Sequence, residues 1–376
     1  MTSTITEPSA AGRAVPPAEL SATVSGSLAA ALRRSAEVER RIGESPHSFR
    51  ILTGDRPTGD LHLGHYFGTL ANRVRLQEAG AELFVLIADY QALTDRDRAD
   101  AVGERVLGLV LDYLATGIDP ARSVIFAHSA VPELNQLLLP FLSLVTVPEL
   151  GRNPTVKDDI AHSRQASVSG LMFTYPVHQA ADILSVKGNL VPVGQDQLPH
   201  VELTRLIARR FNERYPGAGG AGVFPEPDAL LSDAPLLLGT DGQKMSKSRG
   251  NTITLRASAD ETARLIRGAK TDALRHVSYD PAGRPEVSSL VLLAALCTGR
   301  DPVSVADEIG GGGAAQLKRT VTEAVNERFA PVRARRAELA AEPGHAQRVL
   351  RDGCARAAAI AAKTLEEVRD AMGTRY

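Results

Sequence analysis

Hydrophobic positions in the first two thirds of the chain follow two patterns in turn. Short continuous apolar runs, at residues 49–52, 83–88 and 123–127, are typical of strands buried on both faces. Longer segments, at residues 66–79 and 99–115, carry apolar residues at helical spacing. Strands that alternate with helices predict a parallel, Rossmann-like sheet, so we expect an α/β fold for this part of the chain.

The strand pattern largely stops after residue 254, where segments rich in alanine, leucine and arginine begin. Their composition favours helices, with breaks at residues 310–313 and 342–344. At the other end, a stretch rich in serine, threonine, alanine and proline favours disorder and precedes a predicted helix over residues 27–42. The pattern predicts three parts: an N-terminal extension that is partly disordered (1–47), a Rossmann-like domain (48–254) and an α-helical C-terminal domain (255–376).

The composition is that of a soluble enzyme. Of 376 residues, 43% are hydrophobic, which can supply the cores of one large and one smaller domain. No apolar run is long enough to span a bilayer and no signal-peptide core is present, so we expect a cytoplasmic protein without a membrane partner. Two cysteines, Cys297 and Cys354, lack CxxC spacing, which gives no support to a zinc or iron–sulfur site. With a formal net charge of −1, any nucleic-acid contact must be local.

A glycine-punctuated turn follows the first apolar run and leads into a helical segment. It contains Arg56-Pro57-Thr58-Gly59 and then His62-Leu63-Gly64-His65. Gly54, Gly59 and Gly64 allow a ligand to approach the backbone, and the helix N-terminus offers unpaired N–H groups at a positive dipole end. The two histidines share one helix face. This segment is suited to binding phosphate groups.

A second candidate phosphate site is the loop Lys244-Met245-Ser246-Lys247-Ser248, between Gly242 and Gly250. It places two ammonium groups and two hydroxyls in a segment that can close on a polyphosphate. Taken alone, the first motif could be a helix start with surface histidines, and the second a solvated basic loop. Both motifs in this order resemble the two signature motifs of the class I aminoacyl-tRNA synthetases.

Further segments indicate which amino acid is activated. Residues 87–94, 174–184, 191–197 and 200–205 resemble the tryptophanyl-tRNA synthetases, and with the two motifs the resemblance covers residues 49 to about 280. The run Arg152-Asn153-Pro154-Thr155-Val156-Lys157 resembles one branch of that family. The resemblance implies a two-step reaction: L-tryptophan and ATP give tryptophanyl-adenylate and pyrophosphate, and the tryptophanyl group is then transferred to the 3′ end of tRNA(Trp).

Two other functions remain open on the sequence. A tyrosyl-tRNA synthetase shares the fold but fits residues 180–184 and 191–197 poorly. A catalytically silent paralogue that binds tRNA or senses tryptophan is the alternative from another class. Such proteins often lose signature residues, whereas His62, His65, Lys244 and Lys247 are present here.

The resemblance also implies roles for individual residues. The residues expected to be catalytic are His62, His65, Lys244 and Lys247. Those expected to bind ATP are Arg56, Pro57, Thr58, Gly64, His65, Gly194, Gln195, Asp196, Lys244, Met245, Ser246, Lys247 and Ser248. Those expected to bind tryptophan are Gly54, Gln91, Tyr175, Gln179, Asp182 and Gln197. Mg²⁺ is expected to accompany ATP, since the sequence shows no carboxylate cluster for a protein-built magnesium site.

Asp182 is the expected recognition residue for the indole ring. It lies in an apolar helical segment, where a buried carboxylate is costly unless it accepts a strong hydrogen bond such as that of the indole N–H. A solvent-facing aspartate or a salt bridge is the alternative, and Tyr175 could equally be a core aromatic. Gln91 stands where many relatives have histidine and cannot become cationic, so we hypothesise altered recognition of the substrate carboxylate.

The expected macromolecular partners are tRNA(Trp) and a second copy of the chain. Basic residues of the C-terminal helices could contact tRNA phosphates, although an ordinary solvated face is the alternative. These residues are Lys318, Arg319, Arg328, Arg333, Arg335, Arg336, Arg348, Arg351 and Arg356. The family resemblance implies a homodimer with a surface around residues 130 to 170.

Overall fold

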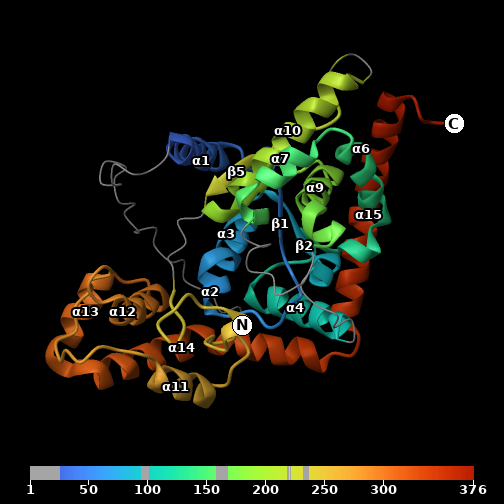
Figure 1. Cartoon of the computed structure of the whole chain (residues 1–376). Helices are drawn as coiled ribbons and strands as arrows, with labels where there is room; N and C mark the ends of the chain where they lie inside the picture. Colours follow the sequence, from blue (N-terminus) through green and yellow to red (C-terminus); the bar gives the residue numbers. More distant parts are fainter. Residues whose placement is uncertain (1–25, 95–100, 158–167, 218–219, 221, 232–236) are drawn as a thin grey trace. The chain divides into compact units, whose positions relative to one another are not determined.

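The computed structural model describes residues 26–94, 101–157, 168–217, 220, 222–231 and 237–376. Contacts divide the chain into two units. We call one the sheet unit; it comprises Ser27–Leu61, Gly68–Ala234 and Arg336–Tyr376 (Figure 1). The other is the motif unit, whose main described segments lie within His62–Phe67 and Pro235–Arg335. Both phosphate motifs of the sequence therefore belong to the motif unit.

The described part of the sheet unit contains one sheet of five parallel strands in the order β3-β2-β1-β4-β5. Ile51 of β1 pairs with Leu83 of β2 on one side and with Leu190 of β4 on the other. The strand order reverses between β1 and β4, which is where open α/β sheets form a ligand crevice at the carboxyl ends of the strands. The strands are β1 (Arg50–Asp55), β2 (Glu82–Ile87), β3 (Ser123–Ala127), β4 (Leu190–Val193) and β5 (Asp228–Leu231).

Both faces of the sheet are covered, which explains the continuous apolar runs in the sequence. On β2, Phe84 and Leu86 pack in one core cluster with residues of α9 and α15, while Leu83 and Val85, of opposite parity, are also buried. The three predicted strands are thus confirmed. The helices here are α1 (Gly26–Glu44), α3 (Ala71–Ala79), α4 (Val102–Thr116), α5 (Pro132–Gln136), α6 (Leu138–Leu142), α7 (Val147–Arg152), α9 (Gly170–Ser185), α10 (Leu198–Arg214) and α15 (His345–Met372).

The C-terminal helix α15 packs directly on the edge strand β3. A Cβ atom on Gly353 would lie 1.9 Å from the carbonyl oxygen of Ile125, so only glycine allows this approach. Arg356 donates to the carbonyl oxygens of Pro120 and Ser123 beside the strand. The C-terminal helices predicted from composition are confirmed, but the contacts divide residues 255–376 between the two units, because α15 completes the core of the sheet.

The motif unit is helical after its loop segments. Tyr66 is in edge-to-face contact with Phe329 at 4.8 Å between ring centroids and accepts a hydrogen bond from Arg328, which ties the first motif to the C-terminal part of the unit. Among the described residues no single helix is long and apolar enough to span a membrane; one sharply bent pair passes on length and composition. The elements are α2 (Leu63–His65), a π-helical turn (Tyr66–Leu70), α11 (Ala259–Gly268), α12 (Pro285–Thr298), α13 (Pro302–Ile309) and α14 (Gly313–Ala341), whose end lies in the sheet unit.

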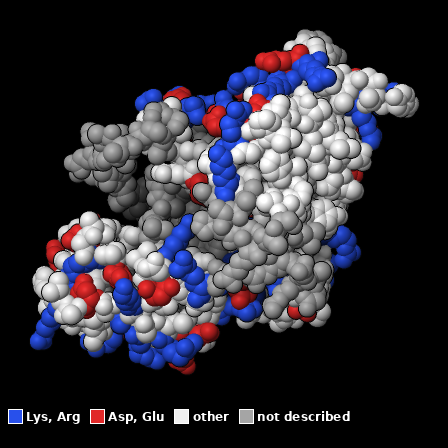
Figure 2. All heavy atoms as spheres, viewed as in Figure 1, with Lys and Arg blue, Asp and Glu red and all other residues white. Residues whose placement is uncertain are grey.

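Many of the basic residues on the C-terminal helices make intramolecular contacts. Figure 2 shows lysine and arginine side chains interspersed with acidic ones over the helices of the motif unit. These contacts favour structural roles for several of the residues that the sequence offered for phosphate binding. The pairs are Lys318 with the Arg267 carbonyl, Arg328 with the Tyr66 hydroxyl, Arg333 with Asn326, Arg336 with Asp112, Arg348 with Glu342, and Arg356 with the carbonyls named above.

A buried ion pair fixes the carboxyl end of β1. Arg73, 2% exposed, donates to a carboxylate oxygen of Asp55 at 2.6 Å, and the buried Tyr113 hydroxyl donates to the same oxygen at 2.7 Å. Arg73 also donates to the carbonyl of Gly54 at 3.3 Å. The guanidinium of α3 therefore holds both residues that end the strand.

We expect Arg73→Met to lower the free energy of unfolding by about 3–5 kcal/mol, because the Asp55 carboxylate loses its buried cation. Arg75→Met is the matched control, since Arg75 lies on the same helix and its ion pair with Glu39 is about half exposed; its loss should cost about 0–1 kcal/mol. Urea unfolding followed by circular dichroism measures both. Equal losses in the two variants would contradict the structural role of Arg73.

Candidate active site

The first phosphate motif forms a tight turn with two neighbouring imidazole rings. The backbone N–H of His62 donates to Nδ1 of His65 at 3.2 Å, and the two ring centroids are 3.7 Å apart. Burial, then the nearby His65 and Lys247, lower the pKa of His62 to about 3. His62 is therefore a neutral imidazole at neutral pH, and the positive charge of Lys247 from the second motif contributes to this state.

Backbone contacts bring the two motifs together within the motif unit. The N–H of Leu63 donates to the carbonyl of Ile253 at 3.0 Å, and His62 forms an antiparallel bridge with Thr254. A Cβ atom on Gly64 would lie 3.0 Å from the His62 ring and 3.5 Å from the sulfur of Met245. The second motif thus packs against the turn of the first, as a shared phosphate site requires.

Asn251 organises the second motif, and the sequence reasoning missed it. Its side-chain oxygen accepts the N–H of Ser246 at 2.8 Å, and its amide donates to Asp241 at 2.7 Å and to the Lys244 carbonyl at 3.2 Å. It is 3% exposed. The loop is flanked by Gly242 and Gly250 with φ of 81° and 66°, a conformation that favours glycine. An asparagine three residues after Ser248 was the available signal.

The loop after β1 carries the other predicted ATP residues. Arg56 and Thr58 are exposed and Pro57 is buried between them, in the sheet unit. Gly54 is explained differently from our expectation: a Cβ there would lie 2.4 Å from the carbonyl of Leu86, so the glycine is needed for packing against β2. Its predicted place beside tryptophan is neither supported nor contradicted by this contact.

The corresponding turn after β4 presents Asp196 to solvent. A Cβ on the exposed Gly194 would lie 2.7 Å from a carboxylate oxygen of Asp196. Thr155 donates to the Asp196 carbonyl at 2.9 Å, and Gln197 donates to its carboxylate at 2.9 Å. Gln195 is exposed as well. Gly194 and Gly54 end the two strands that flank the reversal of strand order, where a crevice is expected.

Helix α9 carries three predicted residues on one face, because Tyr175, Gln179 and Asp182 follow helical spacing; His178, which was not predicted, shares this face. Tyr175 is buried, and its hydroxyl lies 3.2 Å from Nε2 of His200. Gln179 is half-buried. The contact with His200 shows that Tyr175 belongs to the interface between α9 and α10.

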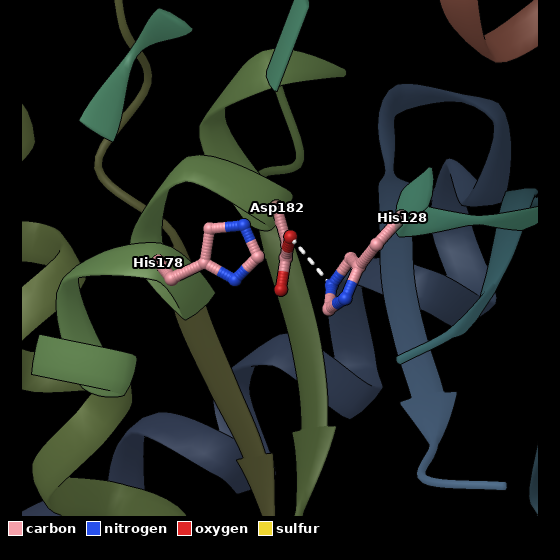
Figure 3. A group of neighbouring side chains, drawn as sticks. All are labelled: His128, His178 and Asp182. Carbon is pink, nitrogen blue, oxygen red and sulfur yellow. Dashed lines mark ion pairs between the residues drawn. The ribbon is translucent and has the colours of Figure 1, made fainter. Parts of the chain in front are cut away.

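Asp182 is 1% exposed, so the solvent-facing alternative is wrong. One of its oxygens lies 2.8 Å from Nε2 of the fully buried His128, the first residue after β3 (Figure 3). Burial opposes the charged imidazole, but Asp182 and then Asp89 raise the pKa of His128. The ring nitrogen is close enough for an ion pair, yet it is not aligned with the carboxylate for a hydrogen bond.

The surroundings of this pair come from neighbouring strand ends. Asp89, after β2, accepts hydrogen bonds from the backbone N–H and hydroxyl of Ser129. Nε2 of His178 lies 2.8 Å from the side-chain oxygen of Asn135. Burial lowers the pKa of His178; Asp182 opposes this shift, and the neighbouring His128 adds to it. Gln91 is half-buried in the short helix Tyr90–Thr94. Sequence reasoning missed His128, although a polar residue directly after a buried strand was a usable signal.

Comparison with known proteins gives a consistent result. The model of the family described as class I tRNA synthetases (W and Y) matches residues 44–330. The tryptophan–tRNA ligase of Treponema pallidum is 45% identical over 332 residues, which cover 86% of this chain and 96% of that protein. The corresponding ligase of Streptococcus pyogenes serotype M1 is 42% identical over 87% of this chain and 98% of its own length.

Solved structures agree with these relatives. The tryptophanyl-tRNA synthetase of Campylobacter jejuni, in complex with ADP and tryptophan, superposes with a TM-score of 0.74 at 32% identity over 86% of this chain and 99% of that chain. A tyrosyl-tRNA synthetase of Archaeoglobus fulgidus in complex with L-tyrosine gives 0.62 at 26% identity, over 80% and 94% of the two chains.

The lowered pKa of His62 predicts a specific loss of stability in acid. Below about pH 6.5 the unfolded chain takes up a proton on this histidine that the folded chain refuses until about pH 3, so the folded state loses stability as the pH falls through that window. His62→Gln removes this contribution, and we expect it to lose about 1–2 kcal/mol less than the wild type between pH 7 and pH 5.

Urea unfolding at several pH values measures the difference. His276→Gln replaces an exposed histidine of the same unit and should retain the wild-type slope. A His62→Gln variant that follows the wild-type pH dependence would show that His62 is not held neutral.

Proposed function

The chain belongs to the class I tRNA synthetases for tryptophan and tyrosine, and from this membership we propose that it works as a tryptophan–tRNA ligase. Tryptophan, ATP and tRNA are its substrates. The observation that carries this choice of amino acid is the identity of its relatives: those that match nearly their whole length at more than 40% identity are tryptophan–tRNA ligases. A tyrosine enzyme is the weaker alternative, since the tyrosyl-tRNA synthetase structure matches less well than the tryptophanyl one.

Activation of tryptophan requires no side-chain nucleophile, because the carboxylate of the amino acid attacks the α-phosphate itself. The protein aligns the two substrates and stabilises the charge that develops on the phosphates. We assign the neutral His62 and its neighbour His65 to positions near the α-phosphate. Lys244, Ser246 and Lys247 hold the departing pyrophosphate, in a loop anchored by Asn251.

Mg²⁺ enters this proposal as part of the ATP substrate. In the described residues of the two motifs, the oxygen and nitrogen groups are histidine, lysine and serine side chains and backbone N–H groups, which suit an anion rather than a hard cation. The phosphate oxygens of ATP would therefore supply the negatively charged ligands of the ion. Bound in this way, Mg²⁺ neutralises the triphosphate and the leaving pyrophosphate.

The tryptophan side chain is assigned to Asp182. The carboxylate is 1% exposed, and its oxygen in the ion pair with His128 has no aligned hydrogen-bond donor among the described residues. The indole N–H is a donor that can bind this carboxylate. Gly54, Gln91, Tyr175, Gln179 and Gln197 remain the proposed residues around the ring and the amino-acid group. The glutamine at 91 is half-buried in the short helix that follows β2, which fits a substrate contact without a charge.

The remaining partners are proposals with different support. Leu139 and Val147, on α6 and α7, are 77% and 70% exposed within the range expected for a dimer surface, which supports a homodimer. The tRNA contact has less support from the basic residues than the sequence indicated, since several are engaged within the chain. A cytoplasmic location follows from the proposed role in translation.

The first test is ATP–pyrophosphate exchange with tryptophan, tyrosine and a mixture of the other amino acids. We expect exchange with tryptophan alone, and a decrease of about 100-fold in kcat/KM for tryptophan in Asp182→Asn, because a charge-assisted hydrogen bond to the indole is lost. Asp112→Asn is the matched control, since Asp112 is equally buried and ion-paired to Arg336.

Exchange with no amino acid would favour the silent paralogue. Exchange with tyrosine would favour the alternative ligase. An Asp182→Asn enzyme with wild-type kcat/KM would leave the ligase function standing and refute the assignment of Asp182.

The second test concerns the anchor of the second motif. Asn251→Ala leaves the Ser246 N–H without its acceptor and should lower the exchange rate by about 100-fold through misplacement of the lysines. Asn326→Ala, which removes hydrogen bonds elsewhere in the same unit, should leave the rate near wild type. Comparable rates in the two variants would mean that Asn251 does not position the loop.

A further inference from the structure

The cluster of His128, His178 and Asp182 contains more unsatisfied polar atoms than its burial allows. Their exposed fractions are 0%, 4% and 1%. Four of the seven buried polar side-chain atoms without a hydrogen-bond partner in the described part of the chain belong to these three residues. Such groups carry a desolvation penalty unless a ligand completes them.

Each of the three residues offers one possible ligand atom, and these atoms lie within 4.8 Å of one another (Figure 3). The atoms without a hydrogen-bond partner are both ring nitrogens of His128, Nδ1 of His178 and the oxygen of Asp182 that forms the ion pair with Nε2 of His128. A tetrahedral zinc site needs ligand atoms roughly 3.3 Å apart, for bonds of about 2.0–2.1 Å. The Nε2–carboxylate distance of 2.8 Å is shorter than this, so a bound ion has to separate that pair by about 0.5 Å and draw the nitrogen of His178 closer.

The outer nitrogens of the two histidines are placed as in a metal site. Nε2 of His178 is 2.8 Å from the side-chain oxygen of Asn135, which makes that nitrogen the donor and leaves a lone pair on Nδ1. Nδ1 of His128 lies 3.9 Å from the carboxylate of Asp89, which Ser129 holds in place. In zinc sites, the second ring nitrogen of a ligand histidine usually donates a hydrogen bond to an oxygen atom, which orients the ring.

An aromatic ring lies beside the cluster. The half-buried Tyr90, in the short helix after β2, has its ring centroid 6.1 Å from that of His128 and 6.5 Å from that of His178. Two imidazoles and one carboxylate prefer a borderline cation to Mg²⁺ or Ca²⁺, and three protein ligands leave a fourth position open.

We propose that His128, His178 and Asp182 form an inhibitory binding site for a divalent cation of the zinc type, which competes with tryptophan for the Asp182 carboxylate. The competitive part rests on the proposed function, because it takes Asp182 as the acceptor for the indole N–H. The binding part rests on the geometry alone.

The test uses the full chain, stripped of metal with a chelator and dialysed against Zn²⁺ or Co²⁺. Elemental analysis is expected to find one Zn²⁺ per chain at this site, and bound Co²⁺ is expected to show the visible absorption of a four-coordinate ion. His128→Gln and His178→Leu should lose this ion and this spectrum. His276→Gln, which changes an exposed histidine, should keep both.

A supporting-residue variant guards against misfolding of the ligand variants. Asn135→Ala removes the oxygen that orients His178 and should weaken Zn²⁺ binding by about 10- to 100-fold without removing a ligand. Saturating tryptophan should displace the ion. In turn, Zn²⁺ should raise the apparent dissociation constant for tryptophan, because the two ligands compete for Asp182.

No bound Zn²⁺ in the wild type would overturn the proposal, as would equal binding by the wild type and the histidine variants, which would place the ion elsewhere. Zn²⁺ binding that tryptophan does not affect would overturn the competition. The metal readouts require no turnover. A wild type that binds the ion but shows no tryptophan-dependent exchange would therefore refute the proposed function and leave the site standing.

Discussion

The covering of the parallel sheet on both faces is the constraint from which the site follows. Side chains on both faces of β2 are buried, so polar side chains can reach a ligand only at the ends of the strands. Because all described strands run in one direction, these ends meet at one edge. Gly54 is the next-to-last residue of β1, and Gln91, His128 and Gly194 come after β2, β3 and β4. Four separate parts of the sequence thus supply two candidate tryptophan residues, the partner of Asp182 and the candidate ATP residue Gly194, and α9 adds Asp182 from outside the sheet.

The phosphate motifs are joined by a different device, because they do not belong to the sheet. Backbone pairing between residues 62–63 and 253–254 holds the first turn against the segment that follows the second motif. Asn251 then fixes the loop through the N–H of Ser246 and the carbonyl of Lys244. This anchor binds backbone groups and does not use the ammonium groups of the lysines. That division suits a reaction catalysed by alignment and charge stabilisation.

Two buried charged clusters in the sheet unit differ in whether their polar atoms have hydrogen-bond partners. Asp55 accepts short hydrogen bonds from Arg73 and Tyr113. It lies at the end of β1, where these bonds fix the backbone. Asp182 and His128 approach each other without a hydrogen bond, and His178 keeps a free lone pair beside them. A protein gains no stability from such unsatisfied groups, whereas a bound indole or cation can complete them. The incomplete cluster is therefore the one in which a ligand is expected.

The sequence alone determined the strand and helix order, the location of both phosphate motifs and the family, because apolar periodicity, glycine positions and short motifs are local properties of the chain. It also placed Asp182 in an apolar helix, but not its partner. Tertiary structure decided that His128 lies against Asp182, that Asn251 anchors the lysine loop, that α15 completes the core on β3, and that many C-terminal arginines are engaged within the chain. Apart from the Asn251 anchor, whose partners lie five and seven residues away, these contacts join residues far apart in sequence. Their formation depends on how the sheet and helices pack, and no local pattern encodes that packing.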